Sequence, residues 1–542
     1  MTLSKVWGSI ESAGSTFRFG LIAFLSIFIM NLFVYGDTLG HPFMMEDQSL
    51  FVAWAKPFNV NSFLSCFNPF AKELIYYRPL TSFVFLLLNH LSNGDPFYCR
   101  FFILLIYSIF ISLFYELTSS VFKSRMTGFL SAVLLSVHPF QGFYVNYINA
   151  SSVLIWGLMM TASLAAHQFY ILTGKERWLY SSGALGVAAL ASHEMAGLLP
   201  VFIFCLNGLA HVSVRKSLQR AGIFALLVAG WHLPRILFFP RNQDILGMVK
   251  TGIAWMGLDV SNVTPSLMVL AGWYVKQFFL PTEVLFMKTI WPVTQSLIFL
   301  NGLIGCLFLY YMWVLFRLRH SNLVWLFVWF FVALSSLGGA FLIAPAQGLT
   351  IEPHWFLVGS FAVYWMVSLL LIKIYREINK VLACGLIIFV LIFLMGWTKN
   401  YNYLWRSQES YCLYWLEKEP NESFPSFWLG ADYLRKGRYK EADYYLQKSL
   451  SGWYIDWETF IDLGSSAIRQ KRWDDGVLWS KKAIALNPSA VEAYNNLGVI
   501  SFENGDAVKA KEYFSQALLL NPKYYKAREN LEVVKRKFHS QK

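Results

Sequence analysis

Acidic residues that could act in group transfer occur in the first polar segment of the chain. The stretch YGDTLGHPFMMEDQSLF follows the apolar run 19–35 and contains the adjacent acids Glu46 and Asp47. A pair of acids beside a bilayer is costly unless it is solvated or used in function. We therefore treat Glu46 and Asp47 as candidate catalytic carboxylates. The open alternative is a plain solvated loop pair.

Cationic residues that could stabilise a departing anion lie in later segments. Arg78 stands before Pro79, which can open a helix, and an arginine fork is well suited to a phosphate. The alternative is that Arg78 is only an interfacial anchor. Besides Arg78, the candidate outer-face cations are Arg100, His232, Arg235, Arg241 and His354.

Other kinds of site lack their sequence signals. The six cysteines show no CxxC spacing, and the H-E-x-x-H and phosphate-loop motifs are absent from the sequence. We therefore predict no metal site, zinc site or disulfide framework. A divalent metal is compatible with the visible residues but is not required by them.

The composition shows what must position these residues. Of 542 residues, 56% are hydrophobic and only 14% are charged, against about 25% charged in an average soluble protein. This excludes a single soluble domain, a disordered chain and a coiled coil. The net charge of +13 sits mainly in short loops between apolar runs, which is the positive-inside pattern of membrane proteins. We therefore expect a bilayer rather than a nucleic acid as the partner.

Apolar runs long enough to cross a bilayer need roughly 20 residues each. The first is 19–35, read as an uncleaved anchor, and the sequence predicts about eleven spans in total. The later ones start near Tyr98, Met126, Ser152, Trp178, Ala196, Ser217, Trp291, Leu323, His354 and Val381. The basic loops share one side, taken as cytoplasmic, if 80–91 and 265–280 lie at the outer interface instead of crossing. Thirteen crossings are the alternative.

The polar tail contains a repeat. Gly430, Gly464 and Gly498 are 34 residues apart, and the pairs Asn487-Pro488 and Asn521-Pro522 keep the same period. Small residues at fixed offsets in a 34-residue period resemble tetratricopeptide repeats, which bind partners in a concave groove. Candidate groove residues are Arg469, Trp479, Asn495 and Asn496. The alternative is an array that only packs on the membrane part or associates with itself.

The order of these elements resembles a known family. An apolar helix, an outer acidic pair, an RPL element at Arg78, the pair His138-Pro139, the element SHEMAGLLP and a repeat tail follow one another. This order resembles the membrane-embedded glycosyltransferases of the C superfamily (GT-C). It is most similar to the branch that carries tetratricopeptide repeats and includes protein O-mannosyltransferases.

The resemblance implies an activity. Members transfer a sugar from a polyprenyl-phosphate carrier to an acceptor on the outer face, with inversion at the anomeric carbon. The resemblance implies Asp47 as the catalytic base, with Glu46 orienting the acceptor or raising the pKa of Asp47 by like-charge repulsion. It implies that Arg78 holds the lipid phosphate. Together with the cations named above, the residues predicted to bind substrate are Arg78, His193, Glu194, Arg235, Arg241 and His354. The implied donor is a polyprenyl-phosphate-linked sugar, and a protein hydroxyl presented by the repeats is a candidate acceptor.

Three positions depart from the family pattern. Glu46 replaces the first of two aspartates, His193 replaces the lysine of a KE pair, and His354 stands where an Arg-Tyr pair is usual. A neutral histidine would hold a phosphate more weakly, so a different donor or an inactive relative stays open. Two other functions remain: a non-enzymatic membrane-anchored scaffold for envelope complexes, and a lipid-linked saccharide ligase that uses His354 or Arg241.

The sequence thus predicts an all-α protein with three parts. A polytopic GT-C-like membrane domain covers 1–398, a linker covers 399–422, and a tetratricopeptide α-solenoid with a closing helix covers 423–542. We expect a multi-pass protein of a bacterial inner membrane with its repeats in the periplasm. The alternative is the endoplasmic reticulum membrane.

Overall fold

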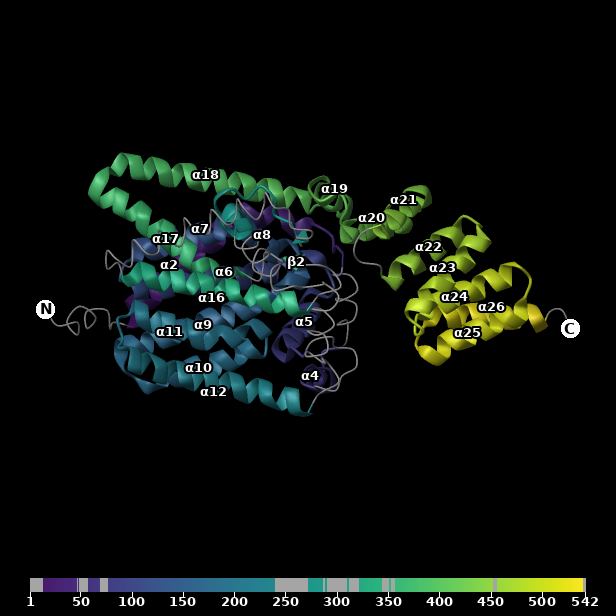
Figure 1. Ribbon diagram of the computed structural model, residues 1–542, viewed down its shortest axis with the longest axis horizontal. Coiled ribbons are helices and arrows are strands. Elements are labelled where there is room, and N and C mark those ends of the chain that lie inside the picture. Colours follow the sequence, from purple (N-terminus) through teal and green to yellow (C-terminus); the bar gives the residue numbers. More distant parts are fainter. Residues whose placement is uncertain are drawn as a thin grey trace. The chain divides into compact units, whose positions relative to one another are not determined.

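The computed structural model describes eleven stretches of the chain: 13–45, 47, 57–68, 77–238, 272–285, 288–289, 310, 321–343, 350–351, 356–451 and 456–539. The chain divides into two compact units, residues 1–407 and residues 408–542. Both units are built from helices (Figure 1). The described strands are the two-residue β1 (Lys288–Thr289) and β2 (Thr350–Ile351), which pair antiparallel.

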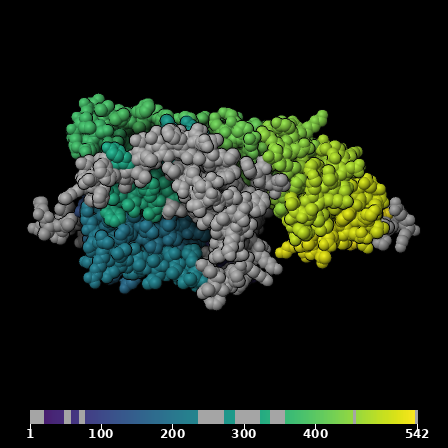
Figure 2. Space-filling model, viewed as in Figure 1, coloured from purple at the N-terminus to yellow at the C-terminus, as the bar shows by residue number. Residues whose placement is uncertain are grey.

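The N-terminal unit is a bundle of apolar helices. Its helices, in chain order, are α2 (Ala13–Tyr35), α4 (Val60–Cys66), α5 (Pro79–Ser92), α6 (Pro96–Phe122), α7 (Arg125–Val137), α8 (Pro139–Asn146), α9 (Ser151–Thr173), α10 (Glu176–Leu190), α11 (Leu199–Leu209), α12 (Val214–Phe238), α16 (Ser321–Ile343), α17 (Ser360–Lys373) and α18 (Lys380–Leu404). Short 3-10 turns precede α9 and α11, and the π-helical turn Ile374–Ile378 links α17 to α18. Helices α9 to α12 pack together, and their atoms form the blue and teal surface in Figure 2.

The prediction of about eleven spans is wrong for the described residues. Four segments are long and apolar enough to cross a membrane, namely Gly20–Gly40, Pro96–Phe122, Ile148–Thr173 and Lys380–Leu404. The bent pair α7 and α8 would make a fifth. Helices α10, α11 and α17 have 15, 11 and 14 residues, so they are too short for the roughly 20 that a span needs. The predicted span at Trp291 lies outside the described residues.

Hydroxyl groups from other helices stabilise the bend between α7 and α8. The two helices meet at an angle of 61° where Pro139 interrupts the helical hydrogen bonds. The freed Ser136 carbonyl accepts from the hydroxyls of Tyr35 at 2.8 Å and Tyr107 at 3.1 Å. The Val137 carbonyl accepts from Thr398 at 2.5 Å. Irregular backbone among apolar helices is tolerated where protein groups satisfy it, as they do here.

The C-terminal unit contains the predicted repeats. It consists of α19 (Gln408–Lys418), α20 (Ser423–Arg435), α21 (Tyr439–Ser449), α22 (Trp457–Arg469), α23 (Trp473–Leu486), α24 (Val491–Glu503), α25 (Ala507–Leu520) and α26 (Tyr525–His539). Consecutive helices pack as antiparallel pairs, α20 with α21, α22 with α23, and α24 with α25 (Figure 1). Helix α26 closes the array against α25, which agrees with the predicted closing helix.

The segment 399–422, predicted as a linker, is largely helical. It contains the last turn of α18 and all of α19. The α19 side chains Cys412 and Leu416 are buried in the same core as Leu429 of α20. Helix α19 therefore covers the open end of the first repeat, as terminal capping helices of solenoids must.

The repeated glycines allow the two helices of a repeat to approach each other. A Cβ atom placed on Gly498 would lie 2.6 Å from the Phe514 ring, and one on Gly430 would lie 2.7 Å from Leu446. Contacts this short force the neighbouring side chain to move, so overpacking at these positions costs stability.

Gly498→Ala is therefore expected to destabilise the third repeat by about 1–3 kcal/mol. Hydrogen exchange of the full chain should show faster exchange of amides in α24 and α25, with α20 and α21 little changed. The variant Gly498→Ala with Phe514→Leu should recover part of the protection, because it makes room for the added methyl group. Unchanged exchange in Gly498→Ala would contradict this account of the close approach.

Candidate functional site

Asp47 is buried at the start of helix α9. Only 1% of the residue is exposed. Its carboxylate accepts the backbone N–H of Asn149 at 2.9 Å and that of Ile148 at 3.3 Å. The first amides of a helix have no partner within it, and the helix dipole favours a negative charge there. Asp47 thus ties the first polar segment to α9.

The pKa of this carboxyl group lies near neutrality. Burial raises the pKa of Asp47 from 3.8 to about 7, although Arg100 and the amides of Asn149 and Ile148 act in the opposite direction. Burial is thus the largest of these causes. The predicted repulsion from Glu46 stays a prediction, because Glu46 lies outside the described residues. Each carboxylate oxygen can accept more than one hydrogen bond. The carboxylate can therefore still accept a hydrogen bond from a further hydroxyl.

Arg100 has a structural role in the same region. It is fully buried in the first turns of α6. Its guanidinium donates to the carbonyls of His41 at 2.7 Å, Pro42 at 2.8 Å and Asn146 at 3.2 Å. Its charge made Arg100 a candidate outer-face cation in the sequence, but its contacts show that it fastens the segment before Asp47 to the end of α8.

A buried amide network continues from this point. The Asn146 side chain donates to the Asn402 amide oxygen at 2.7 Å, and Asn402 donates to the Val34 carbonyl at 3.0 Å. The end of α8 is thereby connected to α18 and α2. His41 stays neutral at physiological pH, because burial and the nearby Arg100 lower its pKa to about 4.

Arg78 and Glu194 form an ion pair across 116 residues of sequence. Arg78 Nη2 donates to Glu194 Oε2 at 2.7 Å, and Arg78 Nε donates to the same oxygen at 3.0 Å. The chain around them is joined as well. The Leu80 amide donates to the Ala191 carbonyl at 3.0 Å, and the Thr81 hydroxyl donates to the Ser192 carbonyl at 2.9 Å.

The ion pair changes what Arg78 can offer a phosphate. Burial disfavours the Glu194 carboxylate, but Arg78 and His193 outweigh it and lower the pKa of Glu194 to about 2. The carboxylate is therefore ionised at any pH well above 2 and balances the charge of Arg78. The neighbouring His193 accepts the Met195 amide at its Nδ1 atom at 3.3 Å, and its ring centroid lies 5.9 Å from that of Trp156.

Asp47 and the Arg78–Glu194 pair with its neighbour His193 both lie along the first turns of α9. Asp47 binds the amides just before this helix, and Trp156 next to His193 is part of it. Trp156 is seven positions after Asn149, which corresponds to a rise of about 10 Å along the helix at 1.5 Å per residue. The sequence predicted the members of both groups, but not how each is held.

The remaining predicted site residues are less fully described. Glu46, Arg241 and His354 lie outside the described residues. Arg235 belongs to α12, one turn beyond Trp231, whose ring stacks on that of Tyr77 at 6.3 Å. This contact brings α12 to the residue that precedes Arg78. Within the stretches that the structure describes, no three His, Cys, Asp or Glu side chains are arranged to hold a metal ion.

Two of the four predicted groove residues, Asn495 and Asn496, connect the third repeat to its neighbours. Asn495 accepts from Asn530 at 2.9 Å, and Asn496 donates to the Ser465 hydroxyl at 3.2 Å. The Trp479 ring stacks on that of Phe460 at 5.8 Å. Arg469 ends α22 and is exposed.

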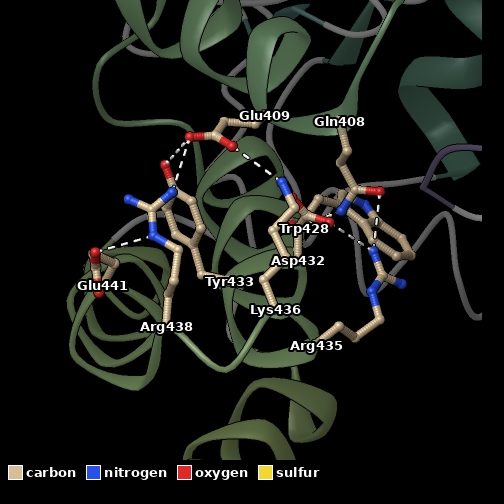
Figure 3. A network of polar contacts seen from close by, with 9 residues as sticks. All are labelled: Gln408, Glu409, Trp428, Asp432, Tyr433, Arg435, Lys436, Arg438 and Glu441. Carbon is tan, nitrogen blue, oxygen red and sulfur yellow. Dashed lines mark hydrogen bonds and ion pairs between the residues drawn. The ribbon is translucent and has the colours of Figure 1, made fainter.

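A second polar network joins α19 to the first repeat, and Figure 3 shows it from close by. Its centre is Glu409, which accepts from the Tyr433 hydroxyl at 2.9 Å, from Lys436 at 3.0 Å and from Arg438 at 3.3 Å (Figure 3). Arg438 also donates to Glu441 at 3.0 Å. The network locks the capping helix onto α20 and the loop that follows it.

Comparison with known proteins identifies the repeats. The tetratricopeptide repeat family model matches residues 491–524, the third repeat. The chain is also similar to the tetratricopeptide repeat domain-containing protein PYG7, chloroplastic, of Arabidopsis thaliana, with 31% identity over 113 residues. That match covers 20% of this chain and 38% of the relative, so the chain spans well under half of the relative's length. The C-terminal unit therefore carries tetratricopeptide repeats, which generally mediate protein–protein interaction.

Proposed function

We propose that this chain is a multi-pass membrane glycosyltransferase with a protein-binding repeat unit. It moves a sugar from a polyprenyl-phosphate donor to an acceptor on the outer face of the membrane. A bacterial inner membrane with the repeats in the periplasm fits this proposal, and the endoplasmic reticulum membrane is the alternative.

The observation that carries the proposal is the state of Asp47. A buried carboxyl whose pKa is about 7, fixed by two backbone amides beside Arg100, suits a general base. Asp47 would take the proton of an acceptor hydroxyl while the hydroxyl oxygen attacks the anomeric carbon. The bond from that carbon to the lipid phosphate breaks, and the phosphate leaves as an anion that needs nearby cations.

The repeat unit supports a role in presenting the acceptor. Tetratricopeptide arrays bind protein segments, and this array has its own core and a capping helix at each end. We propose that it holds a protein partner, which is the acceptor or brings the acceptor to the membrane.

The second candidate function is a non-enzymatic membrane-anchored scaffold. One observation favours it: both oxygens of Asp47 already accept a backbone amide, which is what a purely structural helix cap would do. On this reading the chain needs only its repeats for function. The ligase hypothesis depends on His354 or Arg241, which lie outside the described residues.

The pH dependence of transfer separates the two main candidates. A base must be deprotonated to act, so the rate of sugar transfer should rise about tenfold per pH unit below pH 7 and level off above it. The measurement is the initial rate in membranes that contain the chain, with a panel of polyprenyl-phosphate hexoses as donors.

The control for this profile is Asp37→Asn. Asp37 lies in the same outer segment, and its side chain is 81% exposed beside Lys399. That variant should keep the profile of the unchanged protein. A rate that is flat from pH 5 to pH 8, or that falls as the pH rises, would speak against Asp47 as the base.

A further inference from the structure

Helix α4 exposes a group of apolar side chains. Its residues and their flanks contain no charged side chain from Pro57 to Asn68. Val60 is 72% exposed and Leu64 is 57% exposed. The exposed apolar side chains of this patch, which we call the α4 patch, are Phe58, Val60, Phe63, Leu64 and Phe67.

The α4 patch is held rigidly on α5. The Asn59 side chain caps α4 by accepting the Ser62 amide at 2.9 Å. The Phe63 ring meets the Phe83 ring edge-on at 5.4 Å, and the Phe58 ring stacks on His90 at 5.0 Å. The exposed side chains are therefore presented by a packed and capped helix.

Helix α5, on which the patch packs, is followed closely in the chain by a candidate membrane span. Helix α5 ends at Ser92, and α6, which is long and apolar enough to cross a membrane, begins at Pro96. The first turn of α6 exposes two further aromatic rings, those of Phe97 and Tyr98. Aromatic side chains are enriched where a span leaves the hydrocarbon core for the headgroups.

We propose that the α4 patch inserts into the outer leaflet of the bilayer, next to the outer end of α6. The inference rests on the membrane location in the proposed function. A capped helix with exposed aromatic and aliphatic side chains and no charge suits the boundary between headgroups and acyl chains. The occupant of the patch is lipid, not a second copy of the chain or another protein.

Such an anchor would set the depth of the Arg78–Glu194 pair. The Tyr77 hydroxyl donates to the Phe67 carbonyl, which ends α4, at 3.3 Å. Tyr77 directly precedes Arg78, whose guanidinium binds Glu194. A helix fixed in the leaflet therefore holds this ion pair at a constant distance from the phosphates of the membrane surface.

Spin labelling in lipid vesicles tests the proposal. A nitroxide is attached at Leu64→Cys in the full chain, with Cys384→Ser removing the native thiol that is exposed in the described residues. The vesicles contain phosphatidylcholine and phosphatidylglycerol. Collision with oxygen, which collects in lipid, should exceed collision with a water-soluble nickel chelate several-fold.

Matched labels give the two reference environments. Phe389→Cys in the candidate span α18 should report lipid, and Leu519→Cys in α25 should report water, since both side chains are largely exposed. The Cys384→Ser parent gives the background, and Val60→Cys replaces Leu64→Cys if that variant misfolds.

The outcomes distinguish a failure of the α4 anchor from a failure of the membrane location on which it depends. A label at position 64 that matches Leu519→Cys, while Phe389→Cys reports lipid, would overturn the α4 anchor alone. Spin–spin broadening at position 64 would assign the patch to a second copy, and shielding from both quenchers would assign it to a protein contact; both results refute the lipid assignment. Water at Phe389→Cys would overturn the membrane location and the anchor together.

Discussion

Asp47→Asn is expected to lower sugar transfer by about 10²–10⁴-fold, the usual contribution of a general base. Asparagine has nearly the shape of aspartate and can still accept one of the two amides at the start of α9. The protein should therefore reach the membrane in normal amount. Transfer is measured as initial rate at pH 8, where the Asp47 carboxylate is ionised in the unchanged protein.

The stability of this variant gives an independent check. Because the pKa of Asp47 is raised to about 7 in the fold, the folded protein holds the proton more tightly than the unfolded chain. Stability from this group is complete below about pH 4 and falls as the pH rises toward 7. Asp47→Asn removes that dependence, while Asp37→Asn should keep it. Transfer by Asp47→Asn at the normal rate would refute the catalytic role.

Arg100→Met is expected to cost about 3–5 kcal/mol of the stability of the N-terminal unit. Methionine keeps most of the buried stem but removes the donors to three carbonyl groups, and it removes the positive charge that lowers the pKa of Asp47. The check is thermal unfolding of the purified protein in detergent, together with the amount that reaches the membrane.

Two further variants show why the stability is lost. Arg100→Lys keeps the charge but not the planar fork, so its loss should be intermediate. In the double variant with Asp47→Asn the loss should be smaller than the sum of the single losses, because no unpaired carboxylate remains. Strictly additive losses, or a single variant that unfolds like the unchanged protein, would contradict the role assigned to Arg100.

The repeat unit was largely predictable because its signal is local and periodic. Gly430, Gly464 and Gly498 mark positions where two helices approach closely, and the structure has a helix pair at each. Helix α19 was not predicted, because its sequence QESYCLYWLEK is short, contains no glycine and lies outside the 34-residue period. Its partner surface on α20 appears only in three dimensions.

The apolar helical character of the N-terminal unit was predictable, but the number of helices long enough to be candidate spans was not. An apolar window does not reveal where a helix ends, so the α10 and α11 segments looked like spans although their helices have 15 and 11 residues. Pro139 was visible in the sequence, but the hydroxyls that support the bend come from Tyr35, Tyr107 and Thr398, far away in the chain.

The individual residues of the candidate site could be predicted from the sequence, but not which of them contact one another. The sequence pointed to Arg78 and to Glu194 separately, and their contact depends on α5 docking on the turn after α10. The near-neutral pKa of Asp47 also depends on burial, which the sequence does not report. Only the fold shows that the Arg100 guanidinium donates hydrogen bonds to backbone carbonyl groups.

Sugar analysis of cells with and without the chain tests the central claim most directly. Mass spectrometry of outward-facing proteins and of the polyprenyl-phosphate sugar pool should show a sugar on an acceptor only when the chain is present, and accumulation of its lipid donor when the chain is removed. Identical acceptors and identical donor pools in the two kinds of cell would contradict a glycosyltransferase and leave the repeat-bearing scaffold.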